Sequence, residues 1–456
     1  MRKNNDVNML SGSITKGLIA ICAPVMIMNV IQSLFSLVDM AVLKAFDTDG
    51  MAVGAVGVCT SMITLITNLV VGIAAGANVV IARYIGQQHH RHVDRAVGTA
   101  ITFSVVAGIA LGVFGVVFAQ PLLRIINCPQ ELFDGAVLYF RLYFAGVPIL
   151  LLYNFASNAM RASGNSRVIM IISLVGAGVK LVATYVFTGF LRLGITGVAL
   201  GTITSWCAYA GLSVLYLLRN HGTVRLYRQR LGFHKPELPY ILRIGIPSGI
   251  QMGLFAVANV AITAAVNDFG PQASTGISIA NTFDGILYYI CTAASLAVMP
   301  YVSQNIGAGN VDRAAKSVRK SILLTLVIGV GFGALAVIFS RQMAGLMTDD
   351  PVVVDYACQK MVIISSTYFI CGICDIFAAA LRGMGKSVFP TVVALIFMCG
   401  LRFAWVYLVF PHFPNMTFLY FVWPLSWVAC IVSMLFVYFP TKKQLKQICK
   451  RRPEIA

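Results

Sequence analysis

The sequence predicts an all-α membrane protein with twelve transmembrane helices in two pseudo-symmetric six-helix lobes. Three observations support this prediction: the composition, the recurrence of long apolar segments, and an internal repeat. Of the 456 residues, 58% are hydrophobic and 11% are charged. A soluble chain contains about a quarter charged residues, so this composition is typical of a protein that lies in the bilayer.

Apolar segments long enough to cross a hydrocarbon core of about 30 Å recur along the whole chain. The opening residues are polar and basic, and the first apolar run is too long for a signal peptide, so we expect no cleaved leader. Because twelve spans are an even number, both termini should lie on the same side. The predicted spans are 17–46, 51–82, 96–119, 132–159, 166–189, 196–218, 239–267, 273–304, 319–340, 352–380, 388–410 and 416–439.

Most of the 34 Lys and Arg residues fall in alternate loops, including 83–95, 219–243, 313–320 and 442–452. The opposite loops hold only Lys44, Arg124, Arg192 and Arg341. By the positive-inside rule, both termini are cytoplasmic. The net charge of +18 therefore reflects membrane topology, and we expect no nucleic-acid partner.

Two pairs of segments repeat at an offset near 220 residues. ARYIGQQHHRHVDRA (82–96) matches SQNIGAGNVDRA (303–314), and MRASGNSRV (160–168) matches LRGMGKSVF (381–389). Pro24 and Pro247 stand at a similar offset. The repeats fall on the same side of the membrane, so the two halves should run parallel.

The repeat divides the chain into a cytoplasmic N-terminal segment (1–16), an N-lobe (17–218), a basic cytoplasmic linker (219–238), a C-lobe (239–439) and a basic cytoplasmic tail (440–456). Two related bundles that rock against each other would open a central cleft to either side alternately, which favours transport. A duplicated scaffold that holds no substrate is the alternative.

Paired glycines at a spacing of four predict close helix approaches, namely Gly72 and Gly76, Gly108 and Gly112, Gly197 and Gly201, and Gly329 and Gly333. The eleven cysteines are scattered over the apolar spans. We interpret the Cys371-x-x-Cys374 motif as small packing residues, and His89, His90 and His92 as part of a solvated loop rather than a metal site.

Ionisable residues inside a membrane span are costly and need a partner or a wet cavity. The sequence places five of them deep in spans: Asp39, Lys180, Asp284, Asp375 and Arg402. Arg141 and Lys360 stand nearer the outer ends of their spans, where snorkelling to the interface would explain them.

A buried carboxylate can couple ion binding to a conformational change, because burial favours its neutral form and a nearby cation favours its charged form. Asp39 and Lys180 are candidates for such a pair, although a static pair that fixes helix register would look the same in sequence. Lys180 and Arg402 nearly correspond in the repeat. They could neutralise Asp39 and Asp375, or attract an anionic substrate.

Neutral polar residues supply further hydrogen-bonding groups within the spans: Gln32, Asn154, Gln251, Asn259 and Asn281. Asn154 aligns with Asp375, so both halves place a polar group at the same level. A cleft lined by amides and apolar groups, with few charges, suits amphiphilic and often cationic compounds.

These motifs together resemble the MATE (multidrug and toxic compound extrusion) family over residues 12–440. The resemblance rests on PVMIMNVIQSLFSLVDMAVL with Asp39, on the paired loops and turns described above, and on GITGVALGT (194–202). It implies a central cleft and antiport of drugs against H⁺ or Na⁺, with no cofactor besides the coupling cation. It also implies that Asp39 takes part in that coupling.

The chain departs from the family pattern at three positions. Many members carry Asn and Asp where this chain has Lys180 and Thr184, so a Na⁺ site there should be weakened. One branch carries Glu near Phe255, so Asp284 and Asp375 must supply any ionisable site in the C-lobe. Our hypothesis is that Lys180 pairs with Asp39 until Asp39 is protonated, which favours H⁺.

The sequence therefore predicts a monomeric plasma-membrane antiporter that exports small molecules by rocker-switch alternating access. A flippase for lipid-linked saccharides or cell-wall precursors is the alternative, although only two deep cations are present for an anionic headgroup. A scaffold or receptor lacks a soluble domain. An enzyme is not expected, because no P-loop, metal motif or nucleophile elbow occurs.

Overall fold

The computed structural model describes residues 7–46, 51–126, 128–267, 269–413 and 415–451, and these residues form helices and turns with no β-strand. Side chains are left undescribed at 34–46, 51–54, 61, 255–261, 263–264 and 267. Within the described residues, eleven helices are long and apolar enough to cross a membrane. Helix α7 (Glu237–Asn267) has 31 residues and corresponds to the remaining predicted span. The predicted all-helical, twelve-span fold is confirmed.

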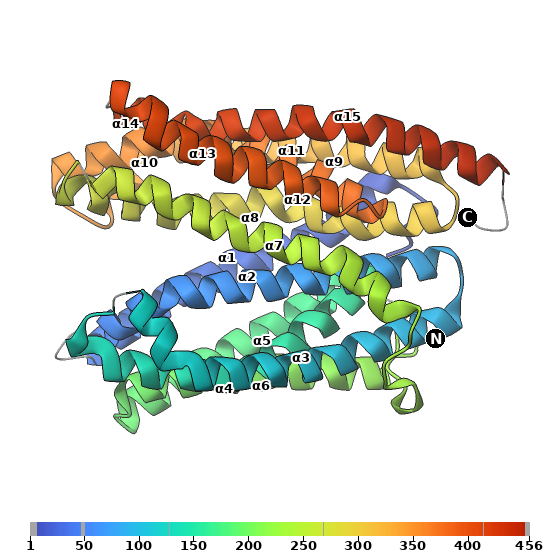
Figure 1. Cartoon of the computed structure of the whole chain (residues 1–456), viewed down its shortest axis with the longest axis horizontal. Coiled ribbons are helices and arrows are strands. Elements are labelled where there is room, and N and C mark those ends of the chain that lie inside the picture. Colours follow the sequence, from blue (N-terminus) through green and yellow to red (C-terminus); the bar gives the residue numbers. More distant parts are fainter. Residues whose placement is uncertain (1–6, 47–50, 127, 268, 414, 452–456) are drawn as a thin grey trace. The chain divides into compact units, whose positions relative to one another are not determined.

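The chain divides into two units, each with its own interior (Figure 1). Unit 1 contains Ile31–Gly249, and unit 2 contains Asn8–Val30 and Ile250–Ala456. Two helices therefore contribute to both units. They are α1 (Ile14–Phe46), which divides after Val30, and α7, which divides after Gly249.

Unit 1 is built around α4, which packs against α2, α3 and α6. The helices that lie wholly within this unit are α2 (Met51–Gly86), α3 (His90–Ile125), α4 (Gln130–Ala162), α5 (Ser166–Thr184), the π-helical turn η1 (Tyr185–Phe190), α6 (Gly194–Arg219) and the short 3-10 turn η2 (Arg228–Arg230).

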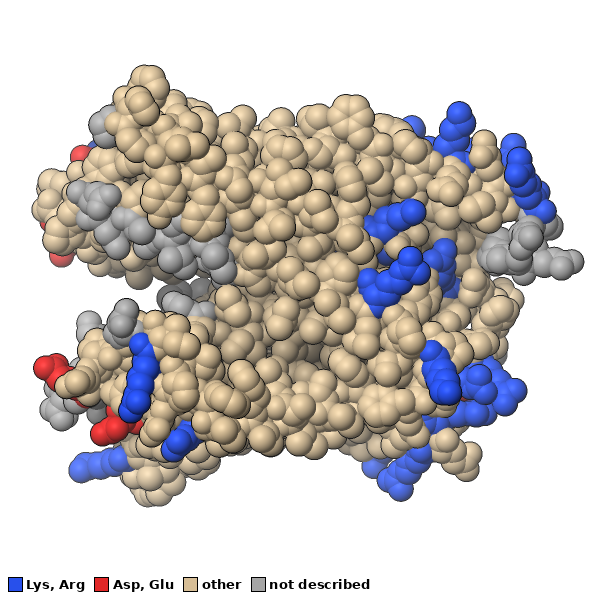
Figure 2. All heavy atoms as spheres, viewed as in Figure 1, with Lys and Arg blue, Asp and Glu red and all other residues tan. Residues whose placement is uncertain are grey.

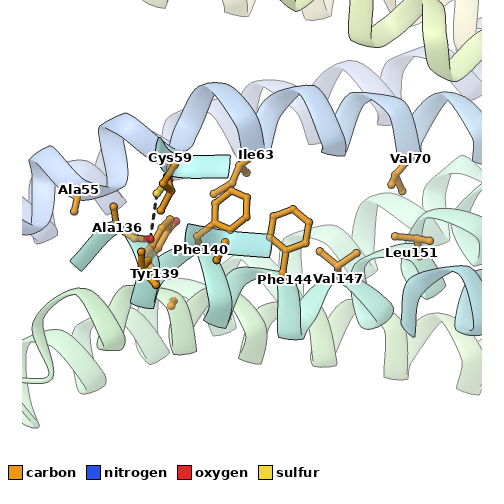
Figure 3. Packing of buried hydrophobic residues seen from close by; sticks show 14 residues of the cluster. Ala55, Cys59, Ile63, Val70, Ala136, Tyr139, Phe140, Phe144, Val147 and Leu151 are labelled. Atoms are coloured by element: carbon orange, nitrogen blue, oxygen red, sulfur yellow. Dashed lines mark hydrogen bonds between the residues drawn. The ribbon is translucent and has the colours of Figure 1, made fainter. Parts of the chain in front are cut away.

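Figure 3 shows part of the packed interface between α2 and α4. Phe140 and Phe144 stack with ring centroids 4.5 Å apart beside Ile63 of α2, and Val70 of α2 lies opposite Leu151 of α4. The Cys59 thiol donates a hydrogen bond to the Ala136 carbonyl oxygen at a distance of 3.4 Å. Apolar side chains thus fill the interior of unit 1, in agreement with the interpretation of the cysteines as packing residues.

Unit 2 is built in the same way around α11, which packs against α8, α9 and α15. Its helices are α8 (Pro271–Gly307), α9 (Val311–Ile338), α10 (Ser340–Gly345), α11 (Pro351–Gly383), α12 (Val388–Ala394), η3 (Leu395–Gly400), α13 (Leu401–Ala404), η4 (Trp405–Val409), η5 (Phe410–His412), α14 (Met416–Tyr420) and α15 (Val422–Arg451). The run from α12 to η5 forms one span that alternates between α-helical and π-helical turns.

The internal repeat recurs in the helix contacts. A Cβ atom at Gly112 of α3 would lie 2.9 Å from the Phe144 carbonyl oxygen of α4. At the same offset, a Cβ at Gly333 of α9 would lie 2.4 Å from the Ser365 carbonyl oxygen of α11. The predicted close approaches at paired glycines are therefore confirmed, and equivalent glycines join equivalent helices.

The turns that follow the central helices of the two units also match. Gly164 follows α4 with φ +82°, and Gly385 follows α11 with φ +88°. This left-handed conformation strains any residue with a Cβ, so both turns require glycine. The repeated R-x-x-G-x-S motif thus encodes the same turn in each unit.

Charged side chains are confined mostly to the helix ends (Figure 2). In each unit, Lys and Arg gather at the end where α2 leads into α3 or α8 leads into α9. The opposite ends of the units carry the acidic side chains seen in this view, with fewer basic ones. This asymmetry agrees with the loop charges from which the topology was predicted.

We expect Gly333→Ala to lower the stability of unit 2 by about 1–3 kcal/mol, because the added methyl group would collide with the α11 backbone. Gly331 lies on the same helix, and a Cβ atom added there would have nothing within 4 Å, so Gly331→Ala is the matched control. It should leave stability unchanged or raise it by up to about 1 kcal/mol. Thermal unfolding of the two purified variants would measure the difference, and equal melting temperatures would contradict this packing.

Candidate functional site

The interior of unit 2 contains several ionisable side chains inside predicted membrane spans. Asp284 on α8, Lys360 and Arg382 on α11, and Arg402 on α13 are all buried, and Asp375 on α11 is half-buried. These residues come from helices that are distant in sequence. Because burying an unpaired charge is costly, the partners of these side chains determine whether this region can hold them in their charged forms.

Close packing of α8 against α11 brings the first pair together. A Cβ at Gly276 of α8 would lie 2.7 Å from the Val353 carbonyl oxygen, and a Cβ at Gly372 of α11 would lie 2.6 Å from the Cys291 carbonyl oxygen. These glycine contacts flank the pair on both sides along the two helices. The helix backbones approach closely enough there for a short Asp side chain to reach across.

Asp284 and Lys360 form an ion pair, with 3.0 Å between Oδ2 and Nζ. Their side chains are 6% and 5% exposed. The Lys360 ammonium also donates to Oδ1 of Asn281, which lies three residues before Asp284 and therefore on the same face of α8. The snorkelling prediction for Lys360 is wrong, because its side chain turns inward to a buried carboxylate.

Trp423 of α15 lies beside two cations. The Lys360 Nζ atom and the Arg402 guanidinium carbon are each 5.7 Å from the centroid of its ring, within the range of a cation–π interaction. Arg402 also donates from Nε and Nη2 to the Ser426 hydroxyl at 3.4 and 3.3 Å. The aromatic ring and these polar groups compensate in part for removing the two cations from water.

Arg382 is a buried cation that the sequence reasoning missed. Its Nη2 atom donates to Oε1 of Gln251 on α7 at 2.9 Å, and its charge acts on the carboxylate of Asp375. The alternation of basic loops places Arg382 among the cytoplasmic loop residues. The repeat aligns Arg382 with Arg161, and this match was the feature of the sequence that could have indicated a shared role. Both side chains are equally buried, each in its own unit.

The predicted polar residues of unit 1 lie apart from this cluster. Asn154 on α4 is half-buried, and its Nδ2 donates to the Leu150 carbonyl oxygen of its own helix at 2.9 Å. Thr184 is buried where α5 meets α6, and its Oγ1 would lie 2.5 Å from a Cβ at Gly201. The position of Thr184 is thus accounted for by helix packing. Lys180 and Gln32 are half-buried and have interaction partners.

The side chains of Asp39 and Asn259 lie outside the described residues. The pair of Asp39 with Lys180 therefore stays a prediction. Cys371 and Cys374 are buried and not joined by a disulfide. Among the described residues, no group of three or more His, Cys, Asp or Glu could hold a metal ion.

A nonpolar hollow of about 750 Å³ lies beside the span that carries Arg402. Its lining residues come from α7 and from the run between η3 and α13, and are Leu254, Leu395, Ile396, Phe397, Cys399, Gly400, Leu401, Phe403 and Ala404. Unit 2 thus combines an apolar surface with a buried polar cluster.

The MatE family model matches the chain twice, over residues 24–186 and 247–408. The chain belongs to the MatE family. The two matches coincide with the two halves of the internal repeat, and the resemblance predicted from the sequence is confirmed. The protein is a multi-pass membrane transporter of the MATE type.

Curated relatives match nearly the whole chain. The probable multidrug resistance protein YoeA of Bacillus subtilis is 27% identical over 437 residues, which are 93% of each chain. A FAD transporter of Shewanella oneidensis is 22% identical and matches 79% of this chain and 80% of its own length. An outward-facing multidrug resistance MATE family transporter has the same fold, with a TM-score of 0.90 at 19% identity over 98% of this chain and all of that one.

We expect Lys360→Met to destabilise unit 2 by about 3–5 kcal/mol, because Asp284 would remain buried without its partner. The double variant Asp284→Asn with Lys360→Met should recover most of that loss, since it removes both charges. Thermal unfolding of the purified proteins in one detergent would measure both changes.

The exposed pair Arg341–Asp355 is the matched control, with side chains 72% and 56% exposed. Arg341→Met should change stability by less than about 1 kcal/mol. A Lys360→Met protein as stable as the wild type, or a double variant no better than the single one, would contradict the importance of the buried pair.

Proposed function

We propose that this transporter exports small amphiphilic, mainly cationic compounds across the plasma membrane in exchange for H⁺ or Na⁺. The observation that carries the proposal is the cluster of partnered charges buried inside the membrane-spanning helices of unit 2. Membership of the MatE family and the multidrug resistance relatives support export as the direction and amphiphilic compounds as the substrate class.

Alternating access of the rocker-switch type suits a chain whose two units have separate interiors. The helices α1 and α7, which pass from one unit into the other, contain Pro24 and Pro247. Each proline removes a backbone hydrogen bond and permits a local bend. Bending of α1 and α7 would allow the units to move as bodies while the chain stays continuous.

Asp39 on α1 is the proposed coupling residue of the N-lobe, with Lys180 of α5 as its partner. Protonation of Asp39 would release the pair, so the site would respond to H⁺. Na⁺ is less favoured there, because Lys180 adds a positive charge and Thr184 stands where many members of the family carry a carboxylate. In the C-lobe, Asp284 and Asp375 supply the ionisable carboxylates.

A lipid-linked saccharide is the alternative substrate. The described interior of unit 2 has three buried cations, but Lys360 is paired with Asp284, and Asp375 lies under the influence of Arg382. Little net positive charge remains for a pyrophosphate headgroup. The nonpolar hollow lined by residues of α7, η3 and α13 instead suits the apolar part of a small amphiphile. We further propose that the transporter works as a monomer with both termini in the cytoplasm.

We expect Asp39→Asn to abolish ion-dependent export, because an amide side chain is neither protonated nor ionised near neutral pH and so cannot take up and release the coupling proton. The measurement is ethidium accumulation in cells that lack their own multidrug pumps, with expression matched by immunoblot. Asp355→Asn is the control, since Asp355 is an exposed carboxylate paired with Arg341. It should export as well as the wild type, whereas full export by Asp39→Asn would reject this coupling role.

A further inference from the structure

Arg161 of unit 1 is a buried cation that forms no ion pair with a described carboxylate. Its side chain is 9% exposed, and its Nε atom is buried with no hydrogen-bond partner among the described residues. The chain contains no Asp or Glu between Asp134 and Glu237. Asp134 stands near the other end of α4, about 40 Å away, and Glu237 pairs with His92. Arg161 therefore lacks the compensation that a buried charge requires.

The equivalent arginine of unit 2 has a carboxylate close to it. The repeat aligns Arg161 with Arg382. Seven residues earlier, unit 2 has Asp375, and the Arg382 charge acts on its carboxylate. Unit 1 has Asn154 at that position, and its neutral amide donates to the Leu150 carbonyl oxygen. The same arginine is thus matched by a carboxylate in one unit and by a neutral side chain in the other.

Aromatic side chains of unit 1 lie near the Arg161 charge. Side chains of a helix tilt toward its N-terminus, and the Arg161 guanidinium acts electrostatically on the Tyr153 hydroxyl, about two turns earlier in α4. That hydroxyl is hydrogen-bonded to Ser173 Oγ of α5 at 2.9 Å. The Tyr153 ring stacks on Tyr209 of α6, with centroids 4.9 Å apart. Because Tyr153 and Asn154 are half-buried, packing does not seal this side of α4.

We propose that Arg161, Tyr153 and Asn154 form a binding site for the carboxylate group of an aromatic, amphiphilic compound. The guanidinium presents paired N–H donors whose geometry matches the two oxygens of a carboxylate. The phenol and the amide can donate further hydrogen bonds, and the half-buried Tyr153 ring suits contact with an aromatic body. The inference goes beyond the proposed export of cationic compounds, because it gives unit 1 a site for acids and zwitterions.

The charge of Arg161 determines which compounds the site accepts. A bound carboxylate would neutralise a guanidinium that the described fold leaves without a counter-charge, and a buried ion pair is screened less by salt than an exposed one. An organic cation would be repelled, because arginine does not lose its proton in proteins. The site therefore distinguishes an acid from an amine or an alcohol of the same shape.

Substitutions in α4 separate this site from a structural arginine. Asn154→Asp gives unit 1 the carboxylate that unit 2 already has, so it should pair with Arg161, raise the melting temperature without ligand and abolish stabilisation by benzoate. Arg161→Gln removes the cation and should also abolish stabilisation by benzoate. Arg141→Gln is the matched control, because Arg141 is an exposed arginine of the same helix that donates to the Val116 carbonyl oxygen. It should respond to benzoate as the wild type does.

The experiment uses the purified full-length protein in detergent. It compares sodium benzoate with sodium chloride at equal ionic strength, and with benzyl alcohol at equal concentration. Saturating benzoate should raise the melting temperature of the wild type by about 2 °C or more relative to sodium chloride. Equal stabilisation by sodium chloride would show an effect of salt alone, and equal stabilisation by benzyl alcohol would show an aromatic contact alone. Either result would overturn the assignment to carboxylates.

An arginine that only stabilises the C-terminal end of α4 predicts a different pattern. In that case Arg161→Gln lowers the melting temperature, Asn154→Asp does not raise it, and benzoate stabilises none of the proteins. Should Arg161→Gln fail to fold, benzoate stabilisation retained in Asn154→Asp would still overturn the proposal, and its loss would support it. Because binding is measured without an ion gradient, the result does not depend on the proposed antiport.

Discussion

A charge inside a membrane-spanning helix must be matched within the protein, because lipid does not solvate it. The described interior of unit 2 follows this constraint. Asp284 lies 3.0 Å from Lys360, Arg382 donates to Gln251, and Arg402 donates to Ser426. Helix packing makes the first of these contacts possible. Glycines on both sides of the Asp284–Lys360 pair allow α8 and α11 to approach closely enough for the two side chains to meet.

The two units share one packing framework but differ in the polarity of their interiors. Equivalent glycines on α3 and α9 contact equivalent positions of the central helices α4 and α11. The polar groups differ, because Asn154 of α4 stands where α11 has Asp375, and the partner of Asn154 is its own helix. A neutral amide needs no counter-charge. In unit 2, by contrast, the spans contain the buried ion pair of Asp284 and Lys360.

Much of the fold could be predicted from the sequence, because hydropathy marks the spans and a glycine pair marks a close helix contact. The approach of Gly333 to Ser365 is an example. The pairing of Lys360 could not be predicted in this way, since depth along a helix does not tell which face points inward. The burial of Arg382 was not predicted for a related reason. Its R-x-x-G-x-S motif is typical of a turn at a helix end, which does not indicate whether the guanidinium points inward. Asp39 remains the residue on which the coupling hypothesis for the N-lobe depends.

We propose that an ion gradient drives an organic cation through this protein against the concentration gradient of that cation. The most direct measurement uses the purified protein in liposomes loaded with a fluorescent organic cation, with a pH or Na⁺ gradient imposed by dilution. We expect uphill movement of the cation that begins when the gradient is imposed and stops when an ionophore collapses it. Movement that only follows the cation's own gradient, at the same rate with the ionophore present, would contradict the account.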